Sequence, residues 1–218
     1  MKLFVFGDTH GVTDFSYLLG RAREADVLLC VGDVTDFSTS IDAVARGLAR
    51  LARDAQRPLI VTHGNHEESS FKQALAVHAR DVVFLHESVH VTDELVIYGY
   101  GGGGFRQRDE LVEKFLRSSH AQHGSREAVH VWLFHGPPYD AGVDVVPGLG
   151  PTGCRTKRSL IDELQPHVVL AGHIHERFGV VETLGSTTVV NPGPEGLLVE
   201  VSYPNTSSTS VSSSGDSR

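Results

Sequence analysis

The sequence has few cysteines and no long apolar run, and both absences limit the kind of protein it encodes. Only two cysteines occur among its 218 residues. Cys30 lies in an apolar run and is predicted to be a core residue, whereas Cys154 lies in a Gly/Pro-rich loop without an evident partner. This pattern excludes a disulfide framework and is typical of a reduced, cytoplasmic protein. The apolar stretch Leu3–Phe6 is too short for a signal peptide, and no run approaches transmembrane length, so no membrane partner is expected.

The chain also lacks an excess of positive charge. Its 27 acidic and 19 basic residues give a formal net charge of −8. A negatively charged protein does not attract polyanions, and no basic or aromatic stripe is present, so nucleic acid is an unexpected partner. A small phosphorylated substrate that metal ions draw in stays compatible with this charge. Nothing in the sequence indicates the oligomeric state.

A change of composition divides the chain into two parts. From residue 202 onward the sequence is rich in Ser, Thr and Gly and has almost no apolar residues. Such a segment cannot bury enough surface to order itself. We therefore predict one domain over residues 1–201, followed by a disordered tail over residues 202–218.

Apolar runs of strand length recur along the domain, with helical patterns between the early ones. Strands are predicted at Lys2–Phe6, Val27–Val31, Pro58–Thr62, Val82–Leu85, Leu95–Tyr98, Val129–Phe134, Val168–Ala171, Gly179–Thr183, Thr187–Asn191 and Leu197–Val201. Helices are predicted at Asp14–Glu24, Ile41–Ala55, Ser69–Arg80, Asp109–His120 and Lys157–Gln165. The early strand–helix alternation indicates a parallel sheet, and the closely spaced later strands indicate antiparallel pairing. Two mixed sheets packed on each other and flanked by helices accommodate both halves.

Ligand-type side chains follow five of these strands, and each time a glycine lies beside them. The candidate ligands are Asp8, His10, Asp33, Asn65, His135, His173 and His175. Because ligands bind at the carboxyl ends of strands in α/β sheets, these side chains are expected to converge. Carboxylate, amide and imidazole groups suit manganese, iron, cobalt, nickel or zinc, and the absence of Cys argues against a zinc finger. Seven ligands exceed the need of one ion and suffice for two if one carboxylate bridges.

Each motif taken alone has an ordinary explanation. Asp8-x-His10 is by itself a turn with an incidental polar pair, and His173-x-His175 can be a pair of surface residues. Gly64-Asn65-His66-Glu67 can be a helix N-terminus with a capping side chain. The occurrence of all five motifs in order at successive strand ends favours the metal site.

These residues resemble the calcineurin-like metallophosphoesterase family. Its pattern of Asp-x-His, Gly-Asp-x-x-Asp, Gly-Asn-His-Glu, His and Gly-His-x-His is matched in order from Asp8 to His175. The resemblance implies a four-layer α/β-β/α sandwich with a dinuclear site. By similarity, the ligands of one metal are Asp8, His10, Asp33 and His175, and those of the other are Asp33, Asn65, His135 and His173. The implied ions are two divalent transition metals, with Mn²⁺ the expected pair and Fe, Zn, Co or Ni the alternatives.

The same resemblance implies roles in catalysis. His66 is implied to be the general acid that protonates the leaving oxygen, and Asp36 to be the carboxylate that orients it. The nucleophile is implied to be a hydroxide that bridges the two metals. The alternative for Asp36 is a helix cap near Ser40.

The sequence departs from the protein Ser/Thr phosphatase branch of this family, in which an Arg that clamps phosphate would follow Asp36. Phe37 stands there instead, and the chain is shorter, so the small prokaryotic-type phosphoesterases are the better match. Arg106, Arg108 and Arg155 are candidate substrate contacts, although exposed loop cations are usually only solvated. The run Tyr98–Gly104 contains the spacing Gly-x-Gly-x-x-Gly of a dinucleotide fingerprint, but the acidic residue that this fingerprint requires about 20 positions later is missing, so we interpret the run as a turn near the site.

The predicted function is therefore that of a metal-dependent phosphoesterase, and more specifically a phosphodiesterase acting on a small phosphoester. A phosphomonoesterase or a nuclease of the same family is an alternative, and the net negative charge argues against the nuclease. A non-catalytic protein-binding scaffold is a further alternative. A scaffold would be expected to lose ligands or the acid, and this chain keeps all of them.

Overall fold

The computed structural model describes residues 1–67, 69–202 and 210–212 and contains two six-stranded sheets. The first sheet consists of β1 (Lys2–Phe6), β2 (Val27–Cys30), β3 (Leu59–Val61), β4 (Val82–Phe84), β13 (Leu197–Glu200) and β14 (Ser210–Ser212). The second consists of β5 (Ser88–Val91), β6 (Leu95–Tyr100), β7 (Val129–Phe134), β10 (Val168–Leu170), β11 (Val180–Leu184) and β12 (Thr187–Asn191). A separate hairpin is formed by β8 (Val145–Val146) and β9 (Gly150–Pro151). The helices are η1 (Ser16–Leu18), α1 (Leu19–Glu24), α2 (Ile41–Ala55), α3 (Ser69–His78), α4 (Glu110–His123), α5 (Arg155–Leu164) and η2 (His175–Arg177).

Both large sheets are mixed, as the sequence predicts. In the first, whose order is β14-β13-β1-β2-β3-β4, the strands β1 to β4 are parallel, and β13 and β14 are added antiparallel. In the second, whose order is β11-β12-β10-β7-β6-β5, the four central strands are parallel and both edge strands are antiparallel. The later chain thus contributes most of the antiparallel pairing.

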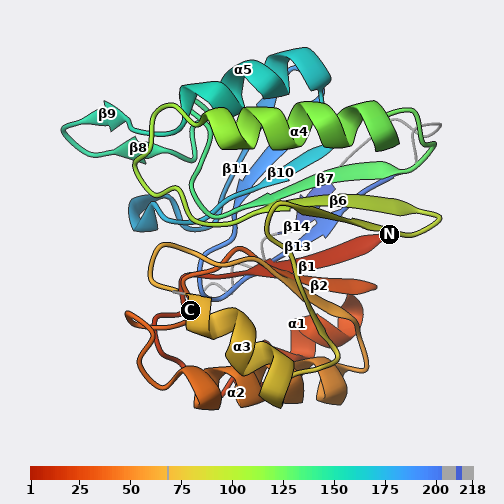
Figure 1. The fold of residues 1–218 in the computed structure, drawn as a ribbon, viewed down its shortest axis with the longest axis vertical. Helices are drawn as coiled ribbons and strands as arrows, with labels where there is room; N and C mark the ends of the chain where they lie inside the picture. Colours follow the sequence, from red (N-terminus) through yellow and green to blue (C-terminus); the bar gives the residue numbers. More distant parts are fainter. Residues whose placement is uncertain (68, 203–209, 213–218) are drawn as a thin grey trace.

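The two sheets pack face to face between helices, which confirms the predicted four-layer sandwich. Helices α1, α2 and α3 cover the outer face of the first sheet, and α4 and α5 cover that of the second (Figure 1). Alternation along β1 explains this arrangement, since Leu3 and Val5 face the second sheet while Phe4 and Phe6 face the helices. In β7, Leu133 packs between the sheets and Trp132 packs beneath the helices. The inner strands β1 and β7 therefore bury both of their faces.

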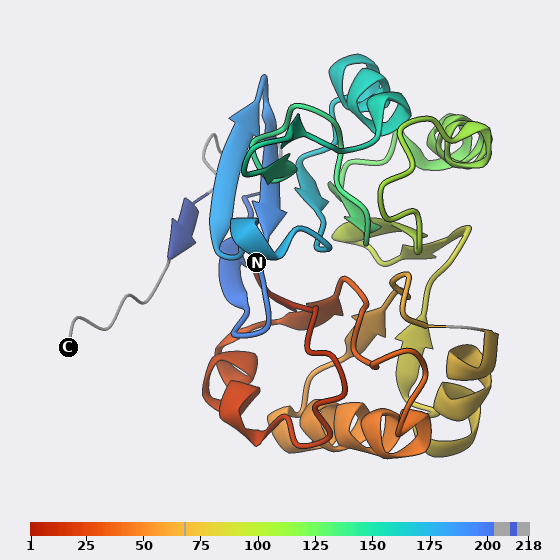
Figure 2. The same cartoon turned by 90° about the vertical axis from the view of Figure 1, so that its left-hand side faces the viewer.

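This packing brings the carboxyl ends of the parallel strands of both sheets to one edge of the sandwich. Strands β1, β2 and β3 run in one direction in the first sheet, as do β7 and β10 in the second. Figure 2 looks onto this edge, where loops of the two halves face each other across the middle of the molecule. All five predicted ligand loops leave the sheets here.

Several features differ from the sequence-based expectation. Strand β5 was not predicted, because its Ser-Val-His-Val sequence is only half-buried at a sheet edge. The hairpin of β8 and β9 was also missed, since each strand has two residues. Cys154, which the sequence places in a loop, is buried and is the N-cap residue of α5. Cys30 is a core residue as predicted, and both cysteines are free thiols. The cytoplasmic location stays a prediction.

Most of the predicted tail lies outside the described residues. Within it, Ser210–Ser212 form β14, which pairs antiparallel with β13, so these three residues differ from the expected disorder. Residues 203–209 and 213–218 are not described, and disorder there stays a prediction. In the described part of the chain, no helix combines the length and the apolar character that crossing a bilayer requires.

Candidate metal centre

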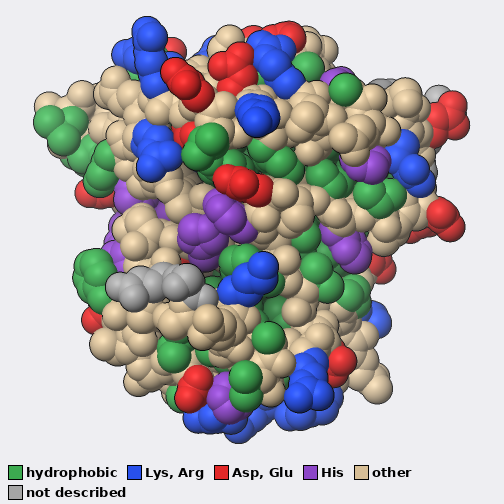
Figure 3. All heavy atoms as spheres, viewed as in Figure 1, with side chains coloured by type: hydrophobic (Ala, Val, Ile, Leu, Met, Phe, Trp, Pro, Cys, Tyr) green, Lys and Arg blue, Asp and Glu red, His purple; other side chains and the backbone are tan. Residues whose placement is uncertain are grey.

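The seven predicted ligands lie together at the edge between the two sheets. Three overlapping groups of side chains have potential ligand atoms within 4.8 Å of one another: Asp8, His10 and His175; His10, Asp33 and His66; and Asp33, His135 and His173. The groups share His10 and Asp33, so they form one continuous cluster. Asn65 joins it because its Oδ1 lies 2.9 Å from Nε2 of His135. Histidine side chains gather at this level between the two halves of the molecule (Figure 3).

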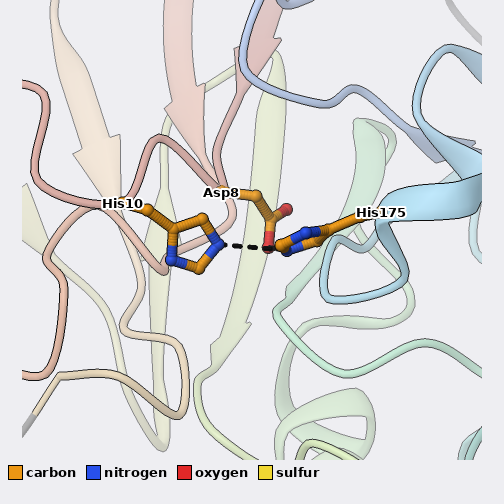
Figure 4. Close-up of side chains that lie close together, drawn as sticks. All are labelled: Asp8, His10 and His175. Atoms are coloured by element: carbon orange, nitrogen blue, oxygen red, sulfur yellow. Dashed lines mark hydrogen bonds and ion pairs between the residues drawn. The ribbon is translucent and has the colours of Figure 1, made fainter.

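One end of the cluster is formed by Asp8, His10 and His175. The Nε2 atoms of the two histidines lie 3.0 Å apart, and Nε2 of His175 lies 3.8 Å from Oδ1 of Asp8. Figure 4 shows these side chains converging, two from the loop after β1 and one from η2. Two imidazole nitrogens and a carboxylate that face the same point are a suitable partial shell for a transition metal.

The other end is formed by Asp33, Asn65, His135 and His173. Nδ1 of the fully buried His135 donates to the backbone carbonyl of Val31 at 3.0 Å, which directs Nε2 toward Asn65 Oδ1 and toward Asp33 Oδ2 at 3.3 Å. Nε2 of His173 is buried and has no hydrogen-bond partner among the described residues. A buried ring nitrogen without a partner is unusual and is explained if it binds a ligand that the protein does not supply.

Several of these side chains occupy strained backbone. Asp8, His10, Asp33 and His173 all have positive φ, between 43° and 73°. A non-glycine residue in this region costs roughly 1–2 kcal/mol, and such residues cluster at functional sites. The strain turns each side chain toward the cluster, at the expense of stability.

Two glycines of the motifs are required by close approach. A Cβ at Gly64 would collide with the Asp33 carboxylate, and a Cβ at Gly172 would collide with that of Asp8. The glycine before each ligand therefore makes room for a carboxylate that comes from another strand. The sequence shows these glycines but not the carboxylates that they accommodate.

Burial and neighbouring charges shift the pKa values of the acids and histidines in the cluster. Burial, with the charge of Asp33 nearby, raises the pKa of Asp8 to about 6, although neighbouring histidines oppose this. Burial alone would also raise the pKa of Asp33, but the hydrogen bond and charge of His135 prevail and lower it to about 2. Burial lowers the pKa of His173 to about 4, with His135 adding to the effect. Among the described residues, the ion-pair partners of both carboxylates are histidines alone.

These observations agree with a divalent cation at the site. The donor set is oxygen and imidazole nitrogen without sulfur. Among the described residues, Nε2 of His173 has no hydrogen-bond partner, and the buried Asp8 carboxylate has no permanently positive ion-pair partner. A bound cation would favour ionised Asp8 and neutral His173. It would give the carboxylate a positive partner and the ring nitrogen of His173 an atom to bind. The residues present therefore fit a divalent metal.

His66 and Asp36 lie beside this cluster. Nδ1 of His66 is 3.7 Å from Oδ1 of Asp36, an ion-pair distance, and Nε2 is 3.9 Å from Oδ2 of Asp33. The backbone N–H of His66 donates to Oδ1 of Asp33 at 2.9 Å, which ties the histidine to the centre. The capping alternative for Asp36 has no support, because Ser40 occupies the N-cap of α2, which has no side-chain cap.

The three arginines predicted to contact substrate make their described contacts away from the ligand cluster. Arg106 donates to the N-cap carboxylate of Asp109 at 3.1 Å. Arg155 stacks on Tyr139 with its guanidinium carbon 3.6 Å from the ring centroid, and with Arg108 it lines a separate surface hollow between α4 and α5. No described contact joins them to the ligand side chains.

Sequence reasoning assigned no role to Glu67. This buried carboxylate accepts from the backbone N–H groups of Asp33 (2.8 Å), Thr35 (2.8 Å) and Gly64 (2.6 Å), and from the Thr35 hydroxyl (2.9 Å). It thereby fastens the loop after β2 to the loop after β3. Its place in the Gly-Asn-His-Glu motif was the available signal.

Lys157, the first residue of a predicted helix, is buried at the start of α5. Its Nζ donates to the carbonyl of Gly136 at 2.6 Å and lies 4.6 Å from the Phe134 ring centroid. Burial lowers its pKa to about 8. Lys157 therefore holds the turn that follows His135. The glycine run contacts the same turn, since Gly136 N–H donates to Gly102, which agrees with its interpretation as a turn near the site.

A two-sheet sandwich with Asp, His and Asn side chains at its strand ends defines the class of metal-dependent phosphoester hydrolases. The family model of the calcineurin-like phosphoesterases matches residues 1–177, and the chain belongs to this family. It is thus a phosphoester hydrolase of a family that binds divalent metals.

The chain is also similar to individual proteins over most of its length. An uncharacterized protein of Methanocaldococcus jannaschii is 28% identical over 203 residues, which cover 87% of this chain and 89% of the relative. A solved structure from Thermus thermophilus has a TM-score of 0.70 at 18% identity, with 91% of this chain and 93% of the other covered. The NAD nucleotidase of Haemophilus influenzae has a TM-score of 0.58 at 11% identity, with 98% of this chain and 49% of the other covered. At these identities the solved structures show a shared fold.

The role of Glu67 can be tested with Glu67→Gln. The new amide nitrogen cannot accept hydrogen bonds, so at least one buried donor loses its partner, at a cost of about 1–3 kcal/mol in the free energy of unfolding. Because Asp33 is positioned through this carboxylate, the affinity for Mn²⁺ should fall by about 10–100-fold. Chemical unfolding and Mn²⁺ titration measure the two effects. Glu195→Gln, which changes an exposed carboxylate, is the control. Unchanged affinity in Glu67→Gln would contradict this role.

The electrostatics predict that Asp8 opposes folding when no metal is bound. Its pKa is raised from 3.8 to about 6, so the folded protein binds this proton more tightly than the unfolded chain does. The metal-free wild type should therefore lose stability, on the order of 2 kcal/mol, as the pH rises from about 4 through about 6.

The variant Asp8→Asn should lack this loss and should melt at a higher temperature than the wild type at neutral pH in chelator. Added Mn²⁺ should raise the Tm of the wild type much more than that of the variant. Asp93→Asn, at an exposed position, should match the wild type in both respects. A lower Tm for metal-free Asp8→Asn would show that the carboxylate stabilises the fold.

Proposed function

We propose that the protein is a phosphodiesterase that uses two divalent metal ions, with His66 as the proton donor to the leaving oxygen. The observation that carries the proposal is that Asp33 belongs to two of the three ligand groups, one with His135 and His173 and one with His10, and His10 in turn belongs to the group of Asp8 and His175. A shared carboxylate is what a two-metal site requires, and two-metal sites are suited to displacement at phosphorus.

The ligand distances support a division between two ions. Asp8, His10 and His175 lie at one end, and Asn65, His135 and His173 lie at the other, so Asp33 is the candidate bridge. When bound, the two cations would neutralise phosphoryl oxygens and supply a water of lowered pKa as the nucleophile. Mn²⁺ is the ion we propose, on the basis of the mixed oxygen and nitrogen donors.

The position of His66 supports its role as the acid. Its Nδ1 faces the Asp36 carboxylate at an ion-pair distance of 3.7 Å, and its Nε2 is directed at the centre, 3.9 Å from Asp33 Oδ2. A protonated Nε2 can therefore deliver its proton to an oxygen that leaves a phosphoryl group held there. His66 is not needed to complete either ligand set.

The placement of the arginines favours a diester over a monoester. A phosphomonoester carries more negative charge, and enzymes commonly clamp it with arginine. Here Arg106 is engaged by Asp109, Arg155 is stacked on Tyr139, and Phe37 occupies the position after Asp36. A singly charged diester needs no such clamp.

Hydrolysis of bis(p-nitrophenyl) phosphate and of p-nitrophenyl phosphate with added Mn²⁺ tests the proposed function. We expect the diester to have the higher kcat/KM and both activities to vanish in chelator. Elemental analysis should find up to two metals per chain in the wild type and a loss of most of both in Asp33→Ala. A single metal that survives this substitution would rule out the bridged pair.

The acid role predicts a defect that depends on the leaving group. His66→Ala should keep both metals while kcat falls by about 10²–10⁴-fold for esters with poor leaving groups. Nitrophenolate leaves readily without a proton, so its esters should be affected least. Asp36→Asn should give a smaller defect of the same kind. The measurement is kcat across esters of graded leaving-group pKa, with metal content checked in each sample. An equal slowing of every ester, or a lost metal, would place His66 in the metal shell.

A further inference from the structure

Two of the largest exposed apolar side chains lie directly on histidines of the site. Phe37 is 71% exposed, and its ring is stacked on His66 with a centroid distance of 3.9 Å. Phe105 is 62% exposed and meets His173 edge-on at 4.5 Å. His66 belongs to the first-sheet side of the centre and His173 to the second-sheet side, so the two phenyl rings flank the cluster from opposite halves.

The backbone at Phe37 is strained without a gain in burial. Asp36–Thr39 is a tight turn closed by the hydrogen bond from Thr39 N–H to the Asp36 carbonyl at 3.0 Å. Its two central residues, Phe37 and Ser38, have φ of +46° and +60°, as in a type I′ turn. Glycine and asparagine are strongly preferred at such positions, and a bulky residue there is an outlier. An exposed phenylalanine in this conformation is poorly explained by stability.

Phe105 is presented in a similar way by a different loop. It follows the glycine run Gly101–Gly104, which leads from β6 toward α4 and lies against the turn that follows His135. Gly104 itself lies beside the ligands, since a Cβ there would be 3.4 Å from His173 and 3.6 Å from Asn65 Oδ1. The loop thus places a largely exposed ring at the rim of the centre.

We propose that Phe37 and Phe105 are specificity-determining residues that hold a planar aromatic group of the substrate, either a nucleobase or an aryl ring, next to the scissile phosphate. This inference rests on the proposed phosphodiesterase function. Each ring has one side against an imidazole and the remainder open to solvent, so a flat group can stack on it. Stacking on an aromatic side chain contributes about 1–3 kcal/mol per base, which corresponds to roughly 5–150-fold in affinity.

Diesters that share p-nitrophenolate as the leaving group test this inference, because they differ only in the retained ester group. The retained groups are methyl, phenyl and thymidin-5′-yl. In the wild type, kcat/KM should be at least about tenfold higher for phenyl and for thymidinyl than for methyl. If only the thymidinyl ester gains, the partner is a nucleoside; if both gain, any planar ring suffices. Both results support an aromatic clamp, by which we mean the pair Phe37 and Phe105 holding a planar group of the substrate.

The double variant Phe37→Gly/Phe105→Ala should reduce these ratios by about tenfold. Because glycine relieves the positive φ, its melting temperature should equal or exceed that of the wild type. A structural role for Phe37 would instead lower the melting temperature. Val77→Ala is the control. It removes a similarly exposed apolar side chain near the end of α3 and should leave the kcat/KM ratios unchanged. Ratios that persist in the double variant would overturn the proposal.

Binding measurements distinguish a failure of the aromatic clamp from a failure of the proposed phosphodiesterase function. The affinities of the Mn²⁺-loaded protein for methyl(phenyl)phosphinate and dimethylphosphinate, monoanions without an ester bond, can be compared by calorimetry without any turnover. Hydrolysis of all the esters without a preference for aromatic groups would refute the clamp and leave the phosphodiesterase intact. Absence of hydrolysis, with an aromatic preference in binding that the double variant loses, would refute the phosphodiesterase and leave the clamp intact. Absence of both would refute both.

Discussion

Two carboxylates, Asp8 and Asp33, are buried at the edge where the two sheets meet, and much of the local structure follows from this. Burial of a charge without a permanent counter-charge is costly, and here the only ion-pair partners of these carboxylates among the described residues are histidines. Asp8 responds with a raised pKa, and Asp33 is held ionised through its contact with His135. A divalent cation between them would satisfy both, which connects the chemistry of the family to the shape of the site.

The surrounding loops are built to hold these groups in place at the expense of stability. Ligand residues adopt positive φ, and glycines make room for carboxylates from neighbouring strands. Glu67 offsets part of this cost because it satisfies four donors from two loops at once. On the side of the second sheet, the buried Lys157 donates to the carbonyl of Gly136 and so holds the turn after His135. The centre therefore depends on buried polar groups that are not themselves candidate ligands.

The two halves of the molecule contribute different parts of the proposed chemistry. Loops of the first sheet carry the candidate bridge Asp33 and the proposed acid His66, and they place Phe37 beside that acid. The second sheet carries His135 and His173, with Phe105 at the rim. Catalysis and selectivity would then both depend on how the sheets pack, because no single loop holds a complete site.

The sequence by itself determined most of the strands, the long helices and the candidate ligands, because these depend on local periodicity and on motifs at strand ends. Phe4 and Leu3 alternate as their strand requires, and Asp8 to His175 occur in the family order. The edge strand β5 was missed because its half-buried sequence lacks a clear pattern. The partners of Glu67, the burial of Lys157 and the positions of Phe37 and Phe105 were decided only by the tertiary structure. These contacts join residues that lie far apart in the chain, and their geometry depends on loop conformation and sheet packing, which no local pattern encodes.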